Sequence, residues 1–415
     1  MKLFTFLCLS HVLLCTLVCG HHGGPHDHDD HDHDDHDHDD HDEAKALSQV
    51  AQSNIHFCYK LYQHLAAAYP NDNIFYSPLS ISMAFSLLSL GANAKTLTQI
   101  REGFGFNTSL VSEETIHEGF KQLLYFIHKP ERNLNLNIAN ALFIDNKQKL
   151  LEKFLDGAKK WYHTEAISTD FLKAAEAVKQ INSYVEKNTN GKIAELLDSV
   201  DQDAIFVFIN YIYFRGKWEN PFNKERTQEG DFHVNENTIV KVPFMHRTGM
   251  YLVAFTDEAT VVSIPYKGDA GTLFILPKEG KFSEVEQNLH KESIVKWKNA
   301  LHEGWVDLSL PKFSVSGTIN LKETLSKMGI VDVFSDQADL SGIAEEANVK
   351  ISKAVHKAVL SVDEKGTEAA GSTAIEISPT MILPSVNFNH PFLFLMYDLK
   401  TKSVLFAGKI INPQK

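Results

Sequence analysis

The feature that most constrains the fold is a segment of about twenty residues, Glu364–Pro384, between two strand-like runs. The run SKAVHKAVLSVD ends at Asp363, and VNFNHPFLFLMY resumes strand character at Val386. A structureless connection of this length is uncommon inside a compact domain and is usually functional or disordered. We therefore ask first what this segment can do.

The segment itself has the pattern of a strand. Alternate residues from Thr367 to Ile377 are small and then aliphatic, the interleaved residues are small or acidic, and no proline interrupts them before Pro379. About ten new backbone hydrogen bonds and the burial of Ile375 and Ile377 would release on the order of 10 kcal/mol. This rivals the whole stability of a domain, about 5–15 kcal/mol. The segment can therefore store a conformational change.

Two motifs in this region resemble those of the serpins. They are the hinge GTEAAGS at Gly366–Ser372 and the run FNHPFLFLM at Phe388–Met396, and KAVHKAVLSVDEKGTEAAG is similar to the antitrypsin-like subgroup. The resemblance covers about Glu43 to Lys415. It implies an α+β serpin fold with a large central mixed β-sheet, two smaller sheets and about eight to nine helices. It also implies that an exposed reactive-centre loop, residues 364–385, inserts into a sheet.

The resemblance implies a secreted inhibitor of extracellular serine proteases that is not itself an enzyme. The protease would attack the loop, and loop insertion would trap the acyl-enzyme. Counting from both motifs places the cut bond between Thr380 and Met381, with Met381–Ile382 as the alternative. Antitrypsin has methionine before the bond, so Thr380 is a departure. The implied hinge residues are Gly366, Thr367, Glu368, Ala369, Ala370 and Gly371.

The residues around the expected bond bear on the target. No Lys or Arg occurs between Gly366 and His390, so proteases with an acidic primary pocket are disfavoured. An elastase or chymotrypsin type, with a small or apolar pocket, fits better.

A buried polar cluster is expected where the sheet parts. The run AIFVFINYIYF is continuously apolar except for Asn210 and predicts a central strand covered on both faces. The resemblance groups Asn210 with Ser77, Ser80 and His356, and places Trp218 near the point where a loop would enter. A satisfied core histidine and a core aromatic are the plain alternatives for His356 and Trp218.

A charge pair is expected at the root of the loop. Lys281, in LPKEGK, is expected from the resemblance to pair with Glu364. An exposed pair contributes about 0–1 kcal/mol, so its value would lie in geometry.

The N-terminal region divides into a leader and a tail. Residues 1–20 have the apolar run and small-residue end of a secretory signal peptide, residues 21–43 are expected to be a disordered His/Asp-rich tail, and 44–415 a single domain. Removing the eleven acids of the tail and Lys2 from the formal charge of −13 leaves −3.

The repeat HDHDD in the tail can bind a divalent metal through neutral imidazoles, although a merely solvated tail is the alternative. The candidate ligands are His26, His28, His31, His33, His36 and His38.

Two single residues complete the candidate sites. Cys58 is the one cysteine outside the leader, so no intrachain disulfide is expected, and it is either a small helix residue or a thiol that pairs with another molecule. Asn107-Thr108-Ser109 is a glycosylation sequon in a polar turn.

Several function classes are disfavoured. The motifs GxSxG and HExxH are absent, and no cofactor is expected. Ser112–Pro130 has only Lys121 and Lys129 as strong bases, so neither nucleic acid nor heparin is an expected partner. We expect a monomer without a membrane span. The rival functions are a non-inhibitory plasma carrier or complex component, and a cleaved loop without either activity.

Overall fold

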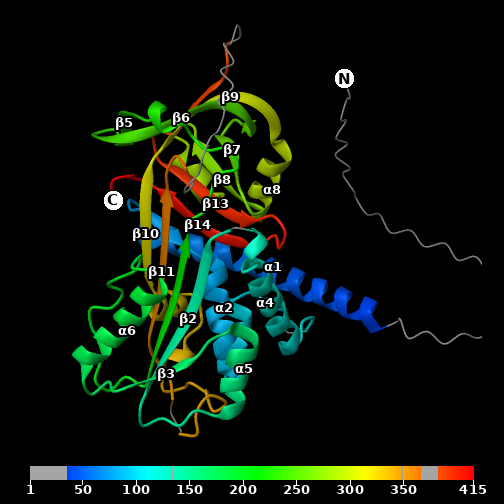
Figure 1. The fold of residues 1–415 in the computed structure, drawn as a ribbon, viewed down its shortest axis with the longest axis vertical. Coiled ribbons are helices and arrows are strands. Elements are labelled where there is room, and N and C mark those ends of the chain that lie inside the picture. Colours follow the sequence, from blue (N-terminus) through cyan, green and yellow to red (C-terminus); the bar gives the residue numbers. More distant parts are fainter. Residues whose placement is uncertain (1–34, 108, 133, 347–348, 366–381) are drawn as a thin grey trace, which may run out of the picture. The chain divides into compact units, whose positions relative to one another are not determined.

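The computed structural model describes residues 35–415, apart from 108, 133, 347–348 and 366–381 (Figure 1). The predicted leader and most of the His/Asp-rich segment therefore lie outside the described residues. The compact unit discussed below covers His41–Lys415.

A mixed five-stranded sheet forms the framework (Figure 1). Its β11–β4 and β2–β3 pairs are parallel, whereas β10–β11 and β2–β4 are antiparallel. The apolar run around Asn210 forms β4, as predicted. In spatial order the strands are β10 (Phe313–Asn320), β11 (Ile351–Val362), β4 (Phe206–Phe214), β2 (Leu136–Asp145) and β3 (Ala166–Thr169).

The remaining strands form two smaller sheets joined by one long strand. β6 pairs with β5 at its beginning, with β9 in its middle and with β7 at its end, so hydrogen bonds link all nine strands. The path runs β1 (Ile74–Tyr76), β14 (Val404–Ile410), β13 (Phe392–Asp398), β8 (Ala270–Pro277), β7 (Ala259–Tyr266), β6 (Thr238–Phe255), β9 (His302–Pro311) and β12 (Ser385–Asn387), with β5 (Gln228–Asn235) beside β6.

Nine α-helices occur in the described part of the chain. Ser77 caps α2 by accepting from the Ser80 N–H, with Pro78 in the first turn. The first helix begins at Asp35, inside the segment 21–43 that the sequence predicted to be disordered, and acids at a helix start are compatible with the helix dipole. The helices are α1 (Asp35–Ala68), α2 (Pro78–Ser89), α3 (Ala94–Gly103), α4 (Glu113–Ile127), α5 (Glu152–Tyr162), α6 (Ala174–Asn188), α7 (Phe282–Gln287), α8 (Lys291–Ala300) and α9 (Leu321–Lys327), and three short 3₁₀ turns cover Pro130–Arg132, Lys224–Arg226 and Asp332–Phe334.

Two apolar cores cover the two faces of the five-stranded sheet. Ile181 of α6 packs with Ile209 of β4 in one core, whereas Phe85 of α2 packs with Phe208 in the other. Neighbouring strand residues point to opposite faces, so β4 is buried on both sides. The predicted α+β architecture with a mixed central sheet is confirmed.

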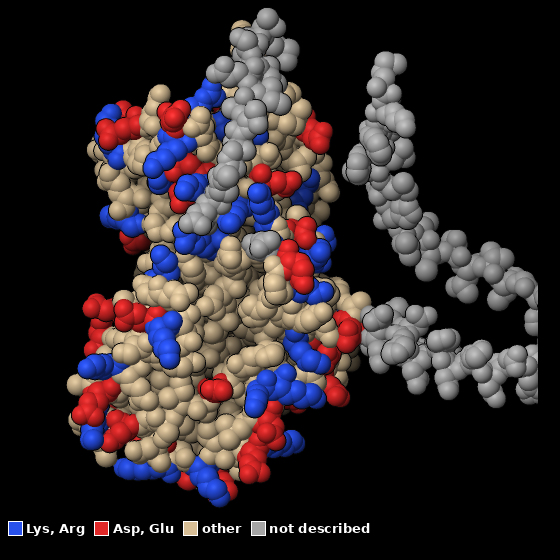
Figure 2. Space-filling view, in the orientation of Figure 1, with Lys and Arg blue, Asp and Glu red and all other residues tan. Residues whose placement is uncertain are grey.

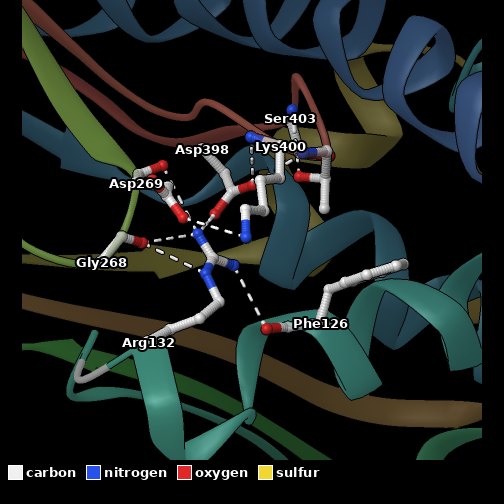
Figure 3. Close-up of polar contacts among 8 residues, drawn as sticks. Phe126, Arg132, Gly268, Asp269, Asp398, Lys400 and Ser403 are labelled. Atoms are coloured by element: carbon white, nitrogen blue, oxygen red, sulfur yellow. Dashed lines mark hydrogen bonds and ion pairs between the residues drawn. The ribbon is translucent and has the colours of Figure 1, made fainter.

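A buried ion pair links the two sheet systems (Figure 3). Arg132, in the turn before β2, contacts the carboxylate of Asp398 at the end of β13, and both side chains are at most 4% exposed. Its guanidinium also donates to the carbonyl oxygens of Gly268, at 2.7 Å, and of Phe126, at 3.2 Å. This contact fixes the entry of β2 against the hairpin turns of the nine-stranded sheet.

No helix in the described residues is long and apolar enough to cross a membrane.

Candidate functional site

The central feature of the site is the parallel pair formed by β4 and β11. β11 ends at Val362 and leads directly into the loop, and the chain returns at Ser385 in β12, which belongs to the other sheet. His356 of β11 lies opposite Asn210 of β4 in this register. On the face shown in Figure 2, few charged side chains lie over the middle of the sheet.

Both the amide nitrogen and the amide oxygen of Asn210 make hydrogen bonds. Its Nδ2 donates to the Ser80 backbone oxygen at 3.1 Å and to Oδ1 of Asn140 at 2.8 Å. Its Oδ1 accepts from the Ser80 hydroxyl at 3.0 Å. These groups are buried, so the bonds compensate the cost of removing them from water.

His356 completes the cluster, and its side chain links β11 to β4. Its Nε2 accepts a hydrogen bond from the Ser77 N–H at 3.0 Å, so the ring proton is on Nδ1, which donates to Oδ1 of Asn210 at 2.6 Å. Burial lowers the pKa of His356 to about 3. The ring is therefore neutral at pH 7, and the structure brings Ser77, Ser80, Asn210 and His356 together as expected.

Asn140 of β2 is a member of this cluster that the sequence analysis missed. It lies opposite Asn210 in the antiparallel β2–β4 register. Its signal was an amide in the otherwise apolar run IANALFI, the same kind of signal that identified Asn210.

Trp218 lies at the loop end of the sheet, apart from the hydrogen bonds of the cluster. Its Nε1–H donates to the backbone oxygen of Asp363 at 2.8 Å, and its ring stacks on Tyr266 with centroids 4.1 Å apart. It therefore holds the last residue before the loop root, which combines a core role with a position beside the loop.

The prediction that Lys281 pairs with Glu364 at the root of the loop is wrong. Glu364 pairs with Lys312, at 3.0 Å, and accepts from the Thr227 hydroxyl at 2.7 Å. Lys281 pairs with Glu284 instead, at 2.6 Å, within its own helical turn. Lys312 ends one LPK run and Lys281 follows another by three residues, and Lys312 is the one between β9 and β10.

The environment of Glu364 favours its charged form. Burial of its carboxylate opposes ionisation, but the bonds from Thr227, the backbone and Lys312 more than offset this and hold its pKa below the usual value. The backbone oxygen of Glu364 also accepts from the Phe222 N–H at 2.9 Å. The loop root is therefore fixed by both its side chain and its main chain.

The expected hinge and the expected cut bond lie outside the described residues, because 366–381 are not described. On the far side, Ile382 is 99% exposed, and the Pro384 oxygen accepts from the Asp307 N–H of β9 at 2.9 Å. The chain is therefore anchored on β9 from Pro384 onward.

Three other predicted sites lie away from the sheet and the loop. Cys58 is buried, and burial raises the pKa of its thiol to about 12, so it fits the structural interpretation. Asn107 is exposed, and its Oδ1 accepts from the Ser109 N–H at 3.1 Å. Of the six candidate metal ligands in the tail, His36 and His38 lie in the first turns of α1 and the other four are outside the described residues. Among the described residues, no group of three or more metal-binding side chains could hold an ion.

Comparisons with known proteins agree with this geometry. The model of the Serpin (serine protease inhibitor) family matches residues 52–413. Alpha-1-antitrypsin of Sus scrofa is 47% identical over 390 residues, which cover 94% of this chain and 90% of that protein. Alpha-1-antiproteinase of Bos taurus is 44% identical over 408 residues, or 98% and 95% of the two chains.

Solved structures give the same fold. The crystal structure of human thyroxine-binding globulin complexed with its hormone has a TM-score of 0.84 at 40% identity and covers 89% of this chain and 99% of that one. Human glycosylated kallistatin has a TM-score of 0.83 at 39% identity, with the same coverage.

Proposed function

This chain belongs to the serpin family, and on that premise we propose that it is a secreted inhibitor that traps extracellular serine proteases covalently. The protease serine attacks the carbonyl carbon of Thr380, the bond to Met381 breaks with release of its amine, and an acyl-enzyme forms. The freed segment then inserts between β4 and β11 before water completes hydrolysis. The protease supplies the catalytic groups, and the inhibitor supplies the conformational change.

The observation that carries this proposal is the parallel pairing of β4 and β11 immediately before the loop. A segment that turns back from the end of β11 runs antiparallel to both strands. Insertion would therefore replace one parallel pair by two antiparallel pairs, which are slightly more stable per residue. The strand-like alternation of Thr367–Ile377 supplies side chains of a suitable size on both faces.

The target class follows from the residue before the bond. Thr380 is small and uncharged, so a protease of the elastase or chymotrypsin type is the expected target. If the register is one residue later, Met381 takes this position, and the preference shifts toward a larger apolar pocket.

A covalent complex on a denaturing gel tests the proposal. The full chain is incubated with pancreatic elastase and with chymotrypsin, and the released C-terminal fragment is sequenced from its N-terminus. A stable complex with a fragment beginning at Met381 is expected, and one beginning at Ile382 assigns the alternative bond. Cleavage by both proteases without any complex would instead favour the carrier role, which the likeness to thyroxine-binding globulin also supports.

Secretion and glycosylation belong to the same proposal. The leader of residues 1–20 and the exposed sequon at Asn107 both fit a secreted glycoprotein. Substitution of Asn107→Gln in a secreting eukaryotic host should increase gel mobility by the mass of one glycan.

A further inference from the structure

A basic pocket lies beyond the end of helix α6 and is here called the α6-turn pocket. It has a volume of about 490 Å³ and is lined by three segments, which are the start of β2, the end of β4 and the turn that follows α6. Its described lining includes Lys192, Arg215 and Lys217 and contains no Asp or Glu. Small-molecule sites have volumes of about 300–1,000 Å³. The pocket therefore offers room for a small molecule together with charge of a single sign.

The strand register places the side chains of the pocket on one face of the five-stranded sheet. Asn137 of β2 lies opposite Tyr213 of β4, and Arg215 follows Tyr213 at the next alternate position. On the same face, Tyr211 belongs to the apolar core under α6, and α6 ends at Asn188. The sheet therefore continues past the end of the helix, and there this face becomes basic. In Figure 2, Lys and Arg side chains gather around the end of the sheet at which the β4 arrow of Figure 1 finishes.

Protein donors occupy carbonyl groups at the C-terminus of α6. The Gly191 N–H donates to the Glu186 oxygen at 2.8 Å, across Asn190, whose φ of 51° closes the helix. Nδ2 of Asn137 donates to the Asn188 oxygen at 2.9 Å. Bare carbonyl groups at a helix end repel an anion, but these two are engaged. The end of α6 is therefore compatible with an anion in the pocket.

The positive charge of the pocket is not compensated within the described structure. Lys192 is exposed and Lys217 is half-buried, and neither makes an ion pair with a described residue. Three bases around one pocket repel one another, and a bound anion removes this repulsion. Tyr213 adds a neutral donor, because burial raises the pKa of its hydroxyl, which keeps its proton at neutral pH.

We propose that the α6-turn pocket binds a small polyvalent oxyanion, of the size of a sugar that carries two or more phosphate or sulfate groups. Lysine and arginine donate charge-assisted hydrogen bonds to such oxygens, and the Tyr213 hydroxyl and the Asn190 amide can donate to the carbon frame's hydroxyl groups. A single inorganic ion would fill only part of 490 Å³, which favours the larger ligand. The inference goes beyond the inhibitory function and holds whether or not the chain traps a protease.

The test measures binding to the full chain by calorimetry in a phosphate-free buffer of low ionic strength. The two probes are inositol hexakisphosphate, which carries phosphate groups, and sucrose octasulfate, which carries sulfate groups. The variants are Lys192→Gln, Lys217→Gln and the double variant. Lys322→Gln is the matched control, because Lys322 is exposed on α9, makes no ion pair with a described residue and does not line the pocket.

We expect one site per chain, with a Kd that is about tenfold weaker or more in the double variant, because two charge-assisted contacts are lost. Lys192→Gln changes an exposed side chain and should keep the melting temperature of the unaltered chain, yet weaken binding by about threefold or more. Lys322→Gln should stay within twofold of the unaltered chain. Binding of one probe alone assigns phosphate or sulfate chemistry to the site, and binding of both shows that the site selects for charge.

Two results would overturn the proposal. The first is that neither probe binds the unaltered chain. The second is that Lys322→Gln weakens binding as much as Lys192→Gln does, since the net charge of the protein would then explain the binding without any pocket.

Discussion

Nδ1 of His356 lies 2.6 Å from Oδ1 of Asn210, and this hydrogen bond joins β11 to β4 in the interior of the sheet. Any strand that enters between them must break it. Because Nε2 of the same ring is occupied by the Ser77 N–H, the bond requires a neutral ring with its proton on Nδ1. The resistance of the sheet to opening is therefore linked to the protonation of one buried histidine.

Acid should destabilise the intact protein through His356. Its pKa is about 3 in the folded chain and about 6.5 when unfolded, so the unfolded state binds the extra proton between these values. The neutral ring's contribution to the free energy of unfolding is fully present above pH 6.5. It is lost as the pH falls toward 3, by up to about 1.4 kcal/mol per pH unit. Urea unfolding midpoints determined between pH 7.5 and 4.5 measure this loss of stability.

The control for this titration is His356→Gln, which keeps a polar side chain that does not titrate. Its midpoint should change less with pH than that of the unaltered chain. Parallel pH profiles for the two proteins would show that His356 does not cause the acid sensitivity.

The lysine at the loop root can be identified by two matched substitutions. Lys312→Met removes the charge partner of the buried Glu364 carboxylate and should lower the unfolding free energy by about 1–2 kcal/mol. Lys281→Met breaks only an exposed pair with Glu284 and should have no measurable effect. Thermal melts of the intact proteins make the comparison. Equal losses of stability in the two variants would contradict the pairing of Lys312 with Glu364.

The sequence predicted features that depend on local chemistry. Ser77 and Pro78 identify the start of α2 because a cap and a first-turn proline act within one turn. The apolar run of β4 was equally clear, since a strand covered on both faces is apolar at almost every position, here with Asn210 as the exception.

The contacts that the sequence did not predict join residues far apart in the chain. Lys281 and Lys312 have similar neighbours, and only the position of Lys312 between β9 and β10 brings it to Glu364. Asn140 was missed because its partner lies on another strand, so its role depends on the β2–β4 register.

The hinge should control trapping without controlling cleavage. Ala369→Arg places a long charged side chain where the segment would enter the sheet, so insertion should stall while the bond near Thr380 is still cut. The variant should therefore behave as a substrate, with about tenfold or more fewer covalent complexes per cleavage event. A denaturing gel measures the ratio of covalent complex to cleaved chain. An unchanged ratio in the variant would argue against insertion as the trapping step.

Nicking the loop should raise the stability of the unaltered chain. Insertion adds on the order of 10 kcal/mol of hydrogen bonds and burial, so the melting temperature should rise by tens of degrees. The nicked Ala369→Arg variant is the control and should show a much smaller rise. An unaltered chain that melts at the same temperature before and after nicking would contradict the proposed storage of energy.

The His/Asp-rich tail should bind divalent metal independently of the folded domain. Neutral imidazoles suit Zn²⁺ and Ni²⁺, so calorimetry at pH 7.5 should detect binding that is lost near pH 5.5, as rings with a pKa of about 6.5 take up protons. A variant without residues 21–42 should bind none of this metal and inhibit proteases at the same rate. Equal binding by both proteins would assign the metal to another part of the chain.

The contact between Arg132 and Asp398 should be the most sensitive ion pair in the described structure. Arg132→Leu leaves the Asp398 carboxylate buried with only the N–H groups of Lys400 and Thr401, at 3.1 and 2.7 Å. Breaking a buried pair from one side costs about 3–5 kcal/mol, whereas removing both charges together costs less. Arg132→Leu should therefore lower the urea midpoint more than the double variant Arg132→Leu/Asp398→Asn does.

The exposed pair of Lys400 with Asp269, in the same group of residues, is the control. Lys400→Met should change the unfolding free energy by less than about 1 kcal/mol, because both side chains are largely in water. If Arg132→Leu is as mild as Lys400→Met, or milder than the double variant, then the buried charge is compensated elsewhere and the guanidinium does not hold the entry of β2 against the nine-stranded sheet.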